Sequence, residues 1–206
     1  MIDTAFLITA FTTLVVVIDP PAQTPIFVAL TQGMDKQTRR GVAIRACLTA
    51  AGILALFAAF GEAVLGFVGI SMPAFRVAGG VLLFLTALDM LFERRTKRRE
   101  NSAEEEEHPD PSVFPLGIPL IAGPGAIATM ILLAGQKQGI EGLAVVIGVM
   151  LTVIAMVFLV YLASGAVARI LGKTGLNVLT RLLGMLLAAL SVQFILDGLK
   201  AFGFAA

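Results

Sequence analysis

Apolar stretches of close to 20 residues, almost free of charged side chains, constrain this chain more than any other feature. Only 14% of its residues are charged and 58% are hydrophobic, and the charges gather between the stretches. A helix of about 20 residues spans the roughly 30 Å hydrocarbon layer of a bilayer, where the backbone must satisfy its own hydrogen bonds. The pattern therefore predicts an all-α membrane protein.

Six transmembrane helices follow from the positions of these stretches. The first lacks a basic leading segment and a small-residue cleavage site, so we expect a retained helix and not a signal peptide. All six belong to one integral membrane domain. The predicted spans cover residues 5–30, 42–60, 74–92, 113–133, 143–162 and 178–199.

The positively charged residues are distributed unequally between the two sides of the membrane that six spans define. Twelve Lys and Arg side chains fall on one side, and only Arg76, Lys137 and Lys200 fall on the other. Loops rich in Lys and Arg stay in the cytoplasm. We therefore expect a multi-pass membrane protein with a cytoplasmic central loop and both termini outside. That loop, residues 93–112, carries a basic block followed by an acidic block. This pattern is typical either of a solvated connector or of a regulatory docking segment.

Two helix breaks interrupt the first and fourth predicted spans. Pro20 and Pro124 lie 104 positions apart in a chain of 206 residues, so the breaks occupy matching places in the two halves. A break frees backbone N–H and C=O groups, which is tolerable in a membrane only where protein or a polar cavity serves them. Paired breaks of this kind indicate the binding site of a transporter.

A second match between the halves indicates an internal duplication. Arg76 and Gly79 correspond to Arg181 and Gly184 at an offset of 105. Each half holds three spans, so the second half must enter the membrane in the opposite direction, as in inverted-repeat transporters. The predicted repeats cover residues 1–92 and 113–206. Arg76 lies on the outer side either as a duplicated structural position or as an arginine that snorkels to the interface.

The residues at the breaks suit a small ligand. Asp19 falls near the middle of its span, where an aspartate is costly and normally functional; the alternative is a residue of a surface turn or a helix cap. The helix that follows the second break directs its N-terminus at the gap, and such an end attracts a carboxylate. A zwitterion or a monovalent cation would fit this chemistry, whereas two kinked helices with nothing bound are the structural alternative. The candidate site residues are Asp19, Pro20, Gln23, Thr24, Gly123, Pro124, Gly125 and Thr129.

Several function classes find no support in the sequence. The chain has one cysteine, Cys47, and one histidine, His108, which lies in the acidic block. This excludes a His/Cys metal cluster and a membrane-embedded catalytic triad, and neither a P-loop nor a nucleic-acid-binding pattern is present. We expect no enzyme, no metal, no cofactor and no nucleic-acid partner.

Several stretches in both halves resemble the MarC family of bacterial inner-membrane proteins, which are also described as neutral amino acid transporters. The resemblance implies six spans with discontinuous helices one and four. It also implies transport of small neutral amino acids, such as glycine or alanine, coupled to a proton or sodium gradient. The stretches are Asp19-Pro20 with Pro25, residues 69–73 leading into 76–80, Pro119 with residues 122–127, and residues 172–173 through 181–184 to 192–195.

One further class stays open beside the transporter. A non-transporting membrane protein with a stress-linked or regulatory role would use the charged central loop as its working part. The sequence does not indicate the direction of transport, the coupling ion or whether copies of the chain form a homo-oligomer.

Overall fold

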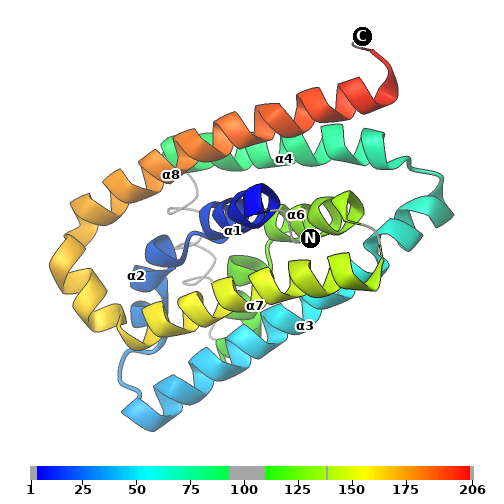
Figure 1. The fold of residues 1–206 in the computed structure, drawn as a ribbon. Coiled ribbons are helices and arrows are strands. Elements are labelled where there is room, and N and C mark those ends of the chain that lie inside the picture. The colour runs from blue at the N-terminus through cyan, green and yellow to red at the C-terminus, as the bar shows by residue number, and fades with distance from the viewer. Residues whose placement is uncertain (1–3, 93–109, 138, 205–206) are drawn as a thin grey trace.

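The computed structural model describes residues 4–92, 110–137 and 139–204, and every regular element in this part of the chain is a helix. The basic and acidic blocks predicted to form the central loop lie outside the described residues, apart from Asp110 at their end. The helices are α1 (Thr4–Ile18), α2 (Pro20–Leu30), α3 (Lys36–Val68), α4 (Met72–Leu91), η1 (Ser112–Ile121), α6 (Pro124–Gln136), α7 (Ile140–Leu162) and α8 (Ser164–Phe202) (Figure 1).

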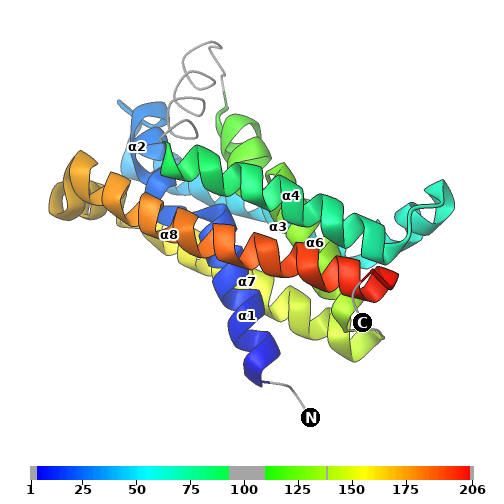
Figure 2. The ribbon, with the colours of Figure 1, turned by 90° about the horizontal axis from the view of Figure 1, so that it is seen from above.

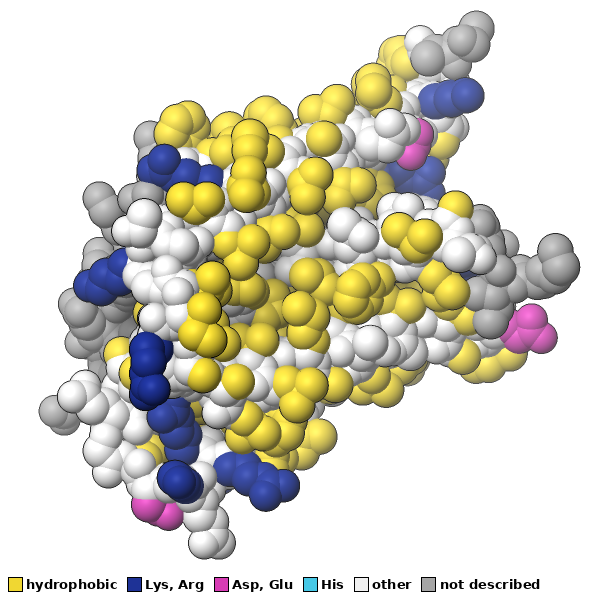
Figure 3. All heavy atoms as spheres, turned by 60° about the vertical axis from the view of Figure 1, so that its left-hand side comes forward, with side chains coloured by type: hydrophobic (Ala, Val, Ile, Leu, Met, Phe, Trp, Pro, Cys, Tyr) yellow, Lys and Arg dark blue, Asp and Glu magenta, His cyan; other side chains and the backbone are white. Residues whose placement is uncertain are grey.

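The length and hydropathy of these helices confirm a helical membrane protein. Five helical stretches are long and apolar enough to cross a bilayer, and η1 with α6 makes a sixth if the bent pair counts as one span. Large apolar side chains also cover the outside, including Phe67, which is 93% exposed. A hydrophobic band crosses the face in Figure 3, with most of the visible Lys and Arg side chains along its left edge and a smaller group at the upper right. An apolar exterior of this extent is typical of contact with lipid.

Two helices extend well past their predicted spans. The second span was expected at residues 42–60, but α3 runs from Lys36 to Val68 and has 33 residues. The sixth was expected at residues 178–199, but α8 begins at Ser164 and has a kink at Gly172, where φ is 59°. Hydropathy marks only the part of a helix that lies in hydrocarbon, whereas backbone hydrogen bonding continues through polar turns.

Both predicted breaks are present in the backbone. The first is at Asp19, which has left-handed dihedral angles (φ 55°, ψ 65°), and α2 then begins with Pro20. Proline suits the first position of a helix because its fixed φ is already helical and its missing N–H has no helical partner there. At the second break η1 has non-helical residues at Phe114 and Ile118, Gly123 is extended, and α6 begins with Pro124. The axes of η1 and α6 differ in direction by 57°.

Helices α4 and α8 lie side by side and antiparallel (Figures 1 and 2). Small residues make this close approach possible: a β-carbon built at Gly80 would lie 2.8 Å from the carbonyl oxygen of Ser191. At the other contacts, a β-carbon at Gly184 would lie 3.2 Å from the oxygen of Ala87, and one at Gly198 would lie 3.0 Å from that of Pro73. These three glycines therefore act as packing residues, as is usual between membrane helices.

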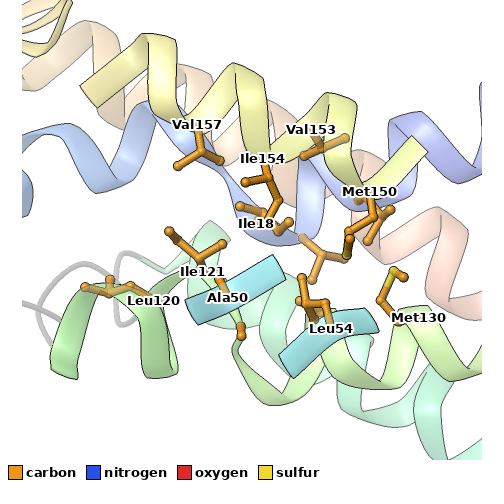
Figure 4. Packing of buried hydrophobic residues seen from close by; sticks show 14 of the residues in the cluster. Ile18, Ala50, Leu54, Leu120, Ile121, Met130, Met150, Val153, Ile154 and Val157 are labelled. Carbon is orange, nitrogen blue, oxygen red and sulfur yellow. The ribbon is translucent and has the colours of Figure 1, made fainter. Parts of the chain in front are cut away.

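The core lies where the broken helices meet α3 and α7. Figure 4 shows Ile18 at the end of α1 packed among side chains of α3, η1, α6 and α7. Ile18, Leu54 and Met130 are fully buried. The first break, at Asp19, is thus enclosed by protein, which satisfies the condition for irregular backbone at membrane depth. The second break is buried at Leu120–Ala122 and Gly125 and exposed at Pro124.

Candidate functional site

The two breaks are in contact with each other. The side-chain amide of Gln23, one turn into α2, donates to the carbonyl oxygens of Ile18 at 2.7 Å and Leu120 at 3.2 Å. These carbonyls belong to the end of α1 and the end of η1, so one buried side chain joins both interruptions. On the other side of the junction, a β-carbon at Gly125 would lie 3.2 Å from Val17 Cγ1. We call this region, which holds Asp19, Gln23, Thr24, Leu120 and Gly125, the break junction.

Asp19 lies inside the break junction and is completely buried. The alternative of a surface turn is therefore wrong. Asp19 does occupy the N-cap position of α2, but within the described first turn of that helix no backbone N–H donates a capping hydrogen bond to its carboxylate. It is the only residue other than glycine with a positive φ in the described chain. A left-handed, non-glycine residue of this kind persists only where the surrounding structure holds it, and such positions cluster at functional sites.

Thr24 differs from five other threonines of the bundle. A threonine inside a helix can donate its hydroxyl to the carbonyl four residues earlier. Thr24 is completely buried, yet its hydroxyl has no hydrogen-bond partner among the described residues. A buried polar group without a partner is costly, so this hydroxyl is suited to a ligand or a water molecule. The threonines that do donate to the carbonyl four residues earlier are Thr13, Thr31, Thr86, Thr129 and Thr152.

The start of α6 forms the second wall of the junction. Gly123 provides no side chain to cap the helix, and Pro124 follows at the first position. Gly125 is buried, whereas Gly123 is half-buried and Pro124 is exposed. Thr129 is buried one turn further on, where its hydroxyl donates to the Gly125 carbonyl at 2.8 Å. This hydrogen bond therefore stabilises the first turn of α6.

Tyr161 is a residue of the junction that sequence reasoning missed. It is fully buried near the end of α7, and its hydroxyl donates to Gln23 Oε1 at 2.5 Å. Its ring stacks on Phe27, with centroids 4.2 Å apart and planes 5° from parallel. Tyr161 is the only tyrosine in a chain without tryptophan. A buried tyrosine hydroxyl usually requires a hydrogen-bond partner, so the single tyrosine of this apolar chain was the sequence feature that could have indicated a polar contact here.

Arg39 lies over the Phe27 ring of the aromatic pair. Its guanidinium carbon lies 5.1 Å from the centroid of the Phe27 ring, and its Nη2 donates to the hydroxyl of Ser164. Ser164 in turn donates to the Tyr161 carbonyl at 2.7 Å. These contacts join the beginning of α3 to the end of α2 and to the α7–α8 junction. The Phe27–Tyr161 pair closes the break junction at this end of the bundle.

The four residues predicted to mark the duplication have different surroundings. Gly79 packs against Leu132 of α6, whereas Gly184 packs against Met90 and Ala87 of α4. Arg76 is partly buried in the second turn of α4, and Arg181 is exposed on α8. The two arginine-glycine stretches thus do not make the same contacts in the described structure.

We expect Tyr161→Phe to lower the free energy of unfolding by about 1–3 kcal/mol, because Gln23 Oε1 would lose a buried hydrogen bond while the ring stack remains. Thermal or denaturant unfolding of the purified protein in detergent measures this. Phe158→Leu, which changes a partly buried aromatic residue one turn earlier on the same helix, is the comparison. Equal stability of wild type and Tyr161→Phe would contradict the bond.

Comparisons with known proteins agree on the family. The sequence model described as MarC family integral membrane protein matches residues 4–202. A membrane protein of Aquifex aeolicus named UPF0056 is 37% identical over 93% of this chain and 91% of its own length. The UPF0056 membrane protein YvbG of Bacillus subtilis is 38% identical over 95% of each chain, and a UPF0056 protein of Archaeoglobus fulgidus is 35% identical over 95% and 92%. No solved structure matches. The chain belongs to the MarC family of integral membrane proteins.

Proposed function

We propose that this protein is a secondary transporter of small neutral amino acids, such as glycine or alanine, in the bacterial inner membrane. The observation that supports it most is the buried hydroxyl of Thr24, which has no partner among the described residues and lies on the helix that follows the first break. Within the same junction, Gln23 bonds the backbone of the second break. Polar groups concentrated where two interrupted membrane helices meet are typical of a transporter's substrate site.

The proposed site has a complementary group for each end of an amino acid. The N-terminus of α6 at Gly123–Gly125 has no side-chain cap, and Gly125 lies beside Val17 of α1, so this end would bind the substrate carboxylate through backbone N–H groups and the helix dipole. Asp19 and the carbonyls before it would receive the ammonium group or a coupling cation. Thr24 would donate to or accept from the substrate. Asp19, Gln23 and Thr24 are completely buried, so a small substrate such as glycine or alanine would need the least rearrangement to enter the junction.

Transport by alternating access requires the junction to open on each side in turn. The two halves, residues 1–92 and 113–206, would act as inverted repeats with α1–α2 and η1–α6 as their discontinuous helices. The side-by-side, antiparallel α4 and α8 would form the contact along which the halves rock. The Phe27–Tyr161 stack, held by Gln23 on one side and Arg39 on the other, would be the gate at the basic end of the bundle.

Uptake of labelled glycine and alanine into proteoliposomes tests this proposal. We expect saturable uptake that rises when a proton or sodium gradient is imposed, with labelled glutamate and lysine as negative controls. Protein-free liposomes and liposomes with the heat-denatured protein give the background. Absence of uptake of any neutral amino acid, in vesicles where the protein is folded and inserted, would overturn the proposal and favour a non-transporting role.

Asp19→Asn is expected to separate uptake from its driving gradient. The amide keeps the size and hydrogen-bonding capacity of the side chain but cannot bind a proton reversibly or offer a full negative charge to sodium. Initial rates with and without the gradient measure the effect: the variant should retain downhill exchange and lose the stimulation. Asp197→Asn, an exposed aspartate on α8, is the control. Unchanged stimulation in Asp19→Asn would remove Asp19 from the coupling role.

A further inference from the structure

A concave site lies next to the Phe27–Tyr161 pair, at the end of the bundle where Lys and Arg residues gather. A cavity of about 560 Å³ opens there between the end of α2, the start of α3 and the α7–α8 junction. Its lining includes Phe27 and Tyr161, whose hydroxyl bonds Gln23 of the break junction. The remaining lining includes four cationic side chains, Lys36, Arg39, Arg40 and Arg169.

The four cations have no acidic neighbour among the described residues that line the cavity. Asp35 precedes Lys36 in sequence, but its carboxylate accepts a hydrogen bond from the Gln37 backbone N–H and caps α3. Residues on one side of a membrane are often basic, but such residues are usually spread over a solvated surface. Cations that converge on one concavity with low-dielectric walls create a focused positive potential that attracts anions.

Arg39 gives this site a fixed element. Its guanidinium is held by the Phe27 ring and by the hydroxyl of Ser164. A guanidinium has five N–H donors in a planar fork that matches a phosphate, so fixing it in place lowers the entropy lost on binding. Lys36, Arg40 and Arg169 are exposed, and their long side chains can close around a ligand.

We propose that this cavity binds a phosphate-bearing anion, either the headgroup of an anionic phospholipid or a free phosphate compound. Basic pockets between helices at the cytoplasmic end of a membrane protein are suited to such headgroups. The exposed side chain of Leu162, on the same cavity wall, offers an apolar contact next to the charges. An anion bound here would contact Arg39, which in turn lies over the Phe27 ring of the Phe27–Tyr161 pair. The binding site does not depend on the transport function proposed above.

The test uses the purified, delipidated, full-length protein in a nonionic detergent and follows its unfolding temperature. Short-chain phosphatidylglycerol, short-chain phosphatidylcholine and inorganic phosphate are titrated separately. Arg40→Gln/Arg169→Gln removes two cations of the cavity without touching Arg39 and its contacts. Lys173→Gln/Arg181→Gln removes the same charge from other positions on α8 and serves as the matched control.

We expect phosphatidylglycerol to raise the unfolding temperature of wild type and of the control pair, and to do so with at least about tenfold weaker apparent affinity in the cavity pair. Phosphatidylcholine should have a smaller effect in all three proteins. A stabilising effect of inorganic phosphate that is lost in the cavity pair supports recognition of the phosphate group alone, and its absence assigns the site to lipid. Equal effects of the two lipids, or equal losses in the cavity and control pairs, would overturn the proposal.

Discussion

Gln23→Leu is expected to reduce amino acid uptake per folded molecule by about 100-fold or more. Leucine has nearly the volume of glutamine, so the change removes hydrogen bonds while keeping most of the packing. The substitution leaves the Leu120 carbonyl and the Tyr161 hydroxyl without the amide that joins them at present. Each such buried group costs about 1–3 kcal/mol, which favours a folded molecule with a rearranged junction, and a shift of about 2.8 kcal/mol toward that arrangement corresponds to a factor of 100.

Two measurements separate this effect from a general loss of structure. The first is the initial rate of uptake in proteoliposomes, normalised to the amount of protein that elutes as a single folded species in detergent. The second is the same rate for Gln193→Leu, an identical substitution at an exposed position whose amide bonds Asp197 on the same helix. Wild-type uptake by Gln23→Leu would show that the bridge between the two breaks has no part in transport.

The second large effect is expected from Gly125→Val. At Gly125 a β-carbon would already lie 3.2 Å from Val17 Cγ1, 3.5 Å from Leu83 Cδ2 and 3.6 Å from Thr86 Oγ1. The two methyl groups of valine extend beyond that point and would push the start of α6 away from α1. Overpacking of this kind costs about 1–3 kcal/mol of stability. We also expect uptake to fall by at least tenfold, since the α6 N-terminus would no longer face the junction.

Gly148→Val is the matched control for this change. Gly148 lies on α7, and a β-carbon there would have no neighbour within 4 Å in the described structure. It should leave both the unfolding temperature and uptake close to those of wild type. Gly125→Ala provides an intermediate, because a single methyl group requires Val17 to move by only a few tenths of an ångström. A wild-type unfolding temperature and uptake rate for Gly125→Val would contradict the close approach of α6 to α1.

Local chemistry explains which features of the fold could be predicted from the sequence. Pro20 and Pro124 act on their own backbone: each removes an N–H donor and fixes φ, so the positions of the breaks follow from the residue type. Asp19 was expected near the middle of its span because apolar sequence resumes at Ile26, and the structure buries its side chain within the protein. The five or six apolar helices could be predicted from hydropathy, which does not depend on how the helices pack.

Contacts between distant parts of the chain could not be predicted in this way. Tyr161 bonds Gln23 across 138 positions, and neither residue indicates the other in a single sequence. Gly79 and Gly184 matched in sequence, but their neighbours are set by how α4, α6 and α8 pack, and these neighbours differ. The polar beginnings of α3 and α8 were missed because hydropathy marks only the apolar part of a helix, whereas the helical hydrogen bonds continue beyond it.

The central claim is that the break junction is the place where the transported molecule binds, and Thr24 allows it to be tested directly. The chain has a single cysteine, Cys47, which is buried. In a Cys47→Ala background, Thr24→Cys places one thiol at the junction with little change in size. Its rate of reaction with a water-soluble maleimide is measured in proteoliposomes, with and without alanine, and with glutamate as the control solute.

We predict that the thiol reacts, because transport must open the junction to water, and that alanine slows the reaction in a saturable manner while glutamate does not. A reaction rate that is the same with and without saturating alanine, in a variant that still takes up alanine, would contradict the account.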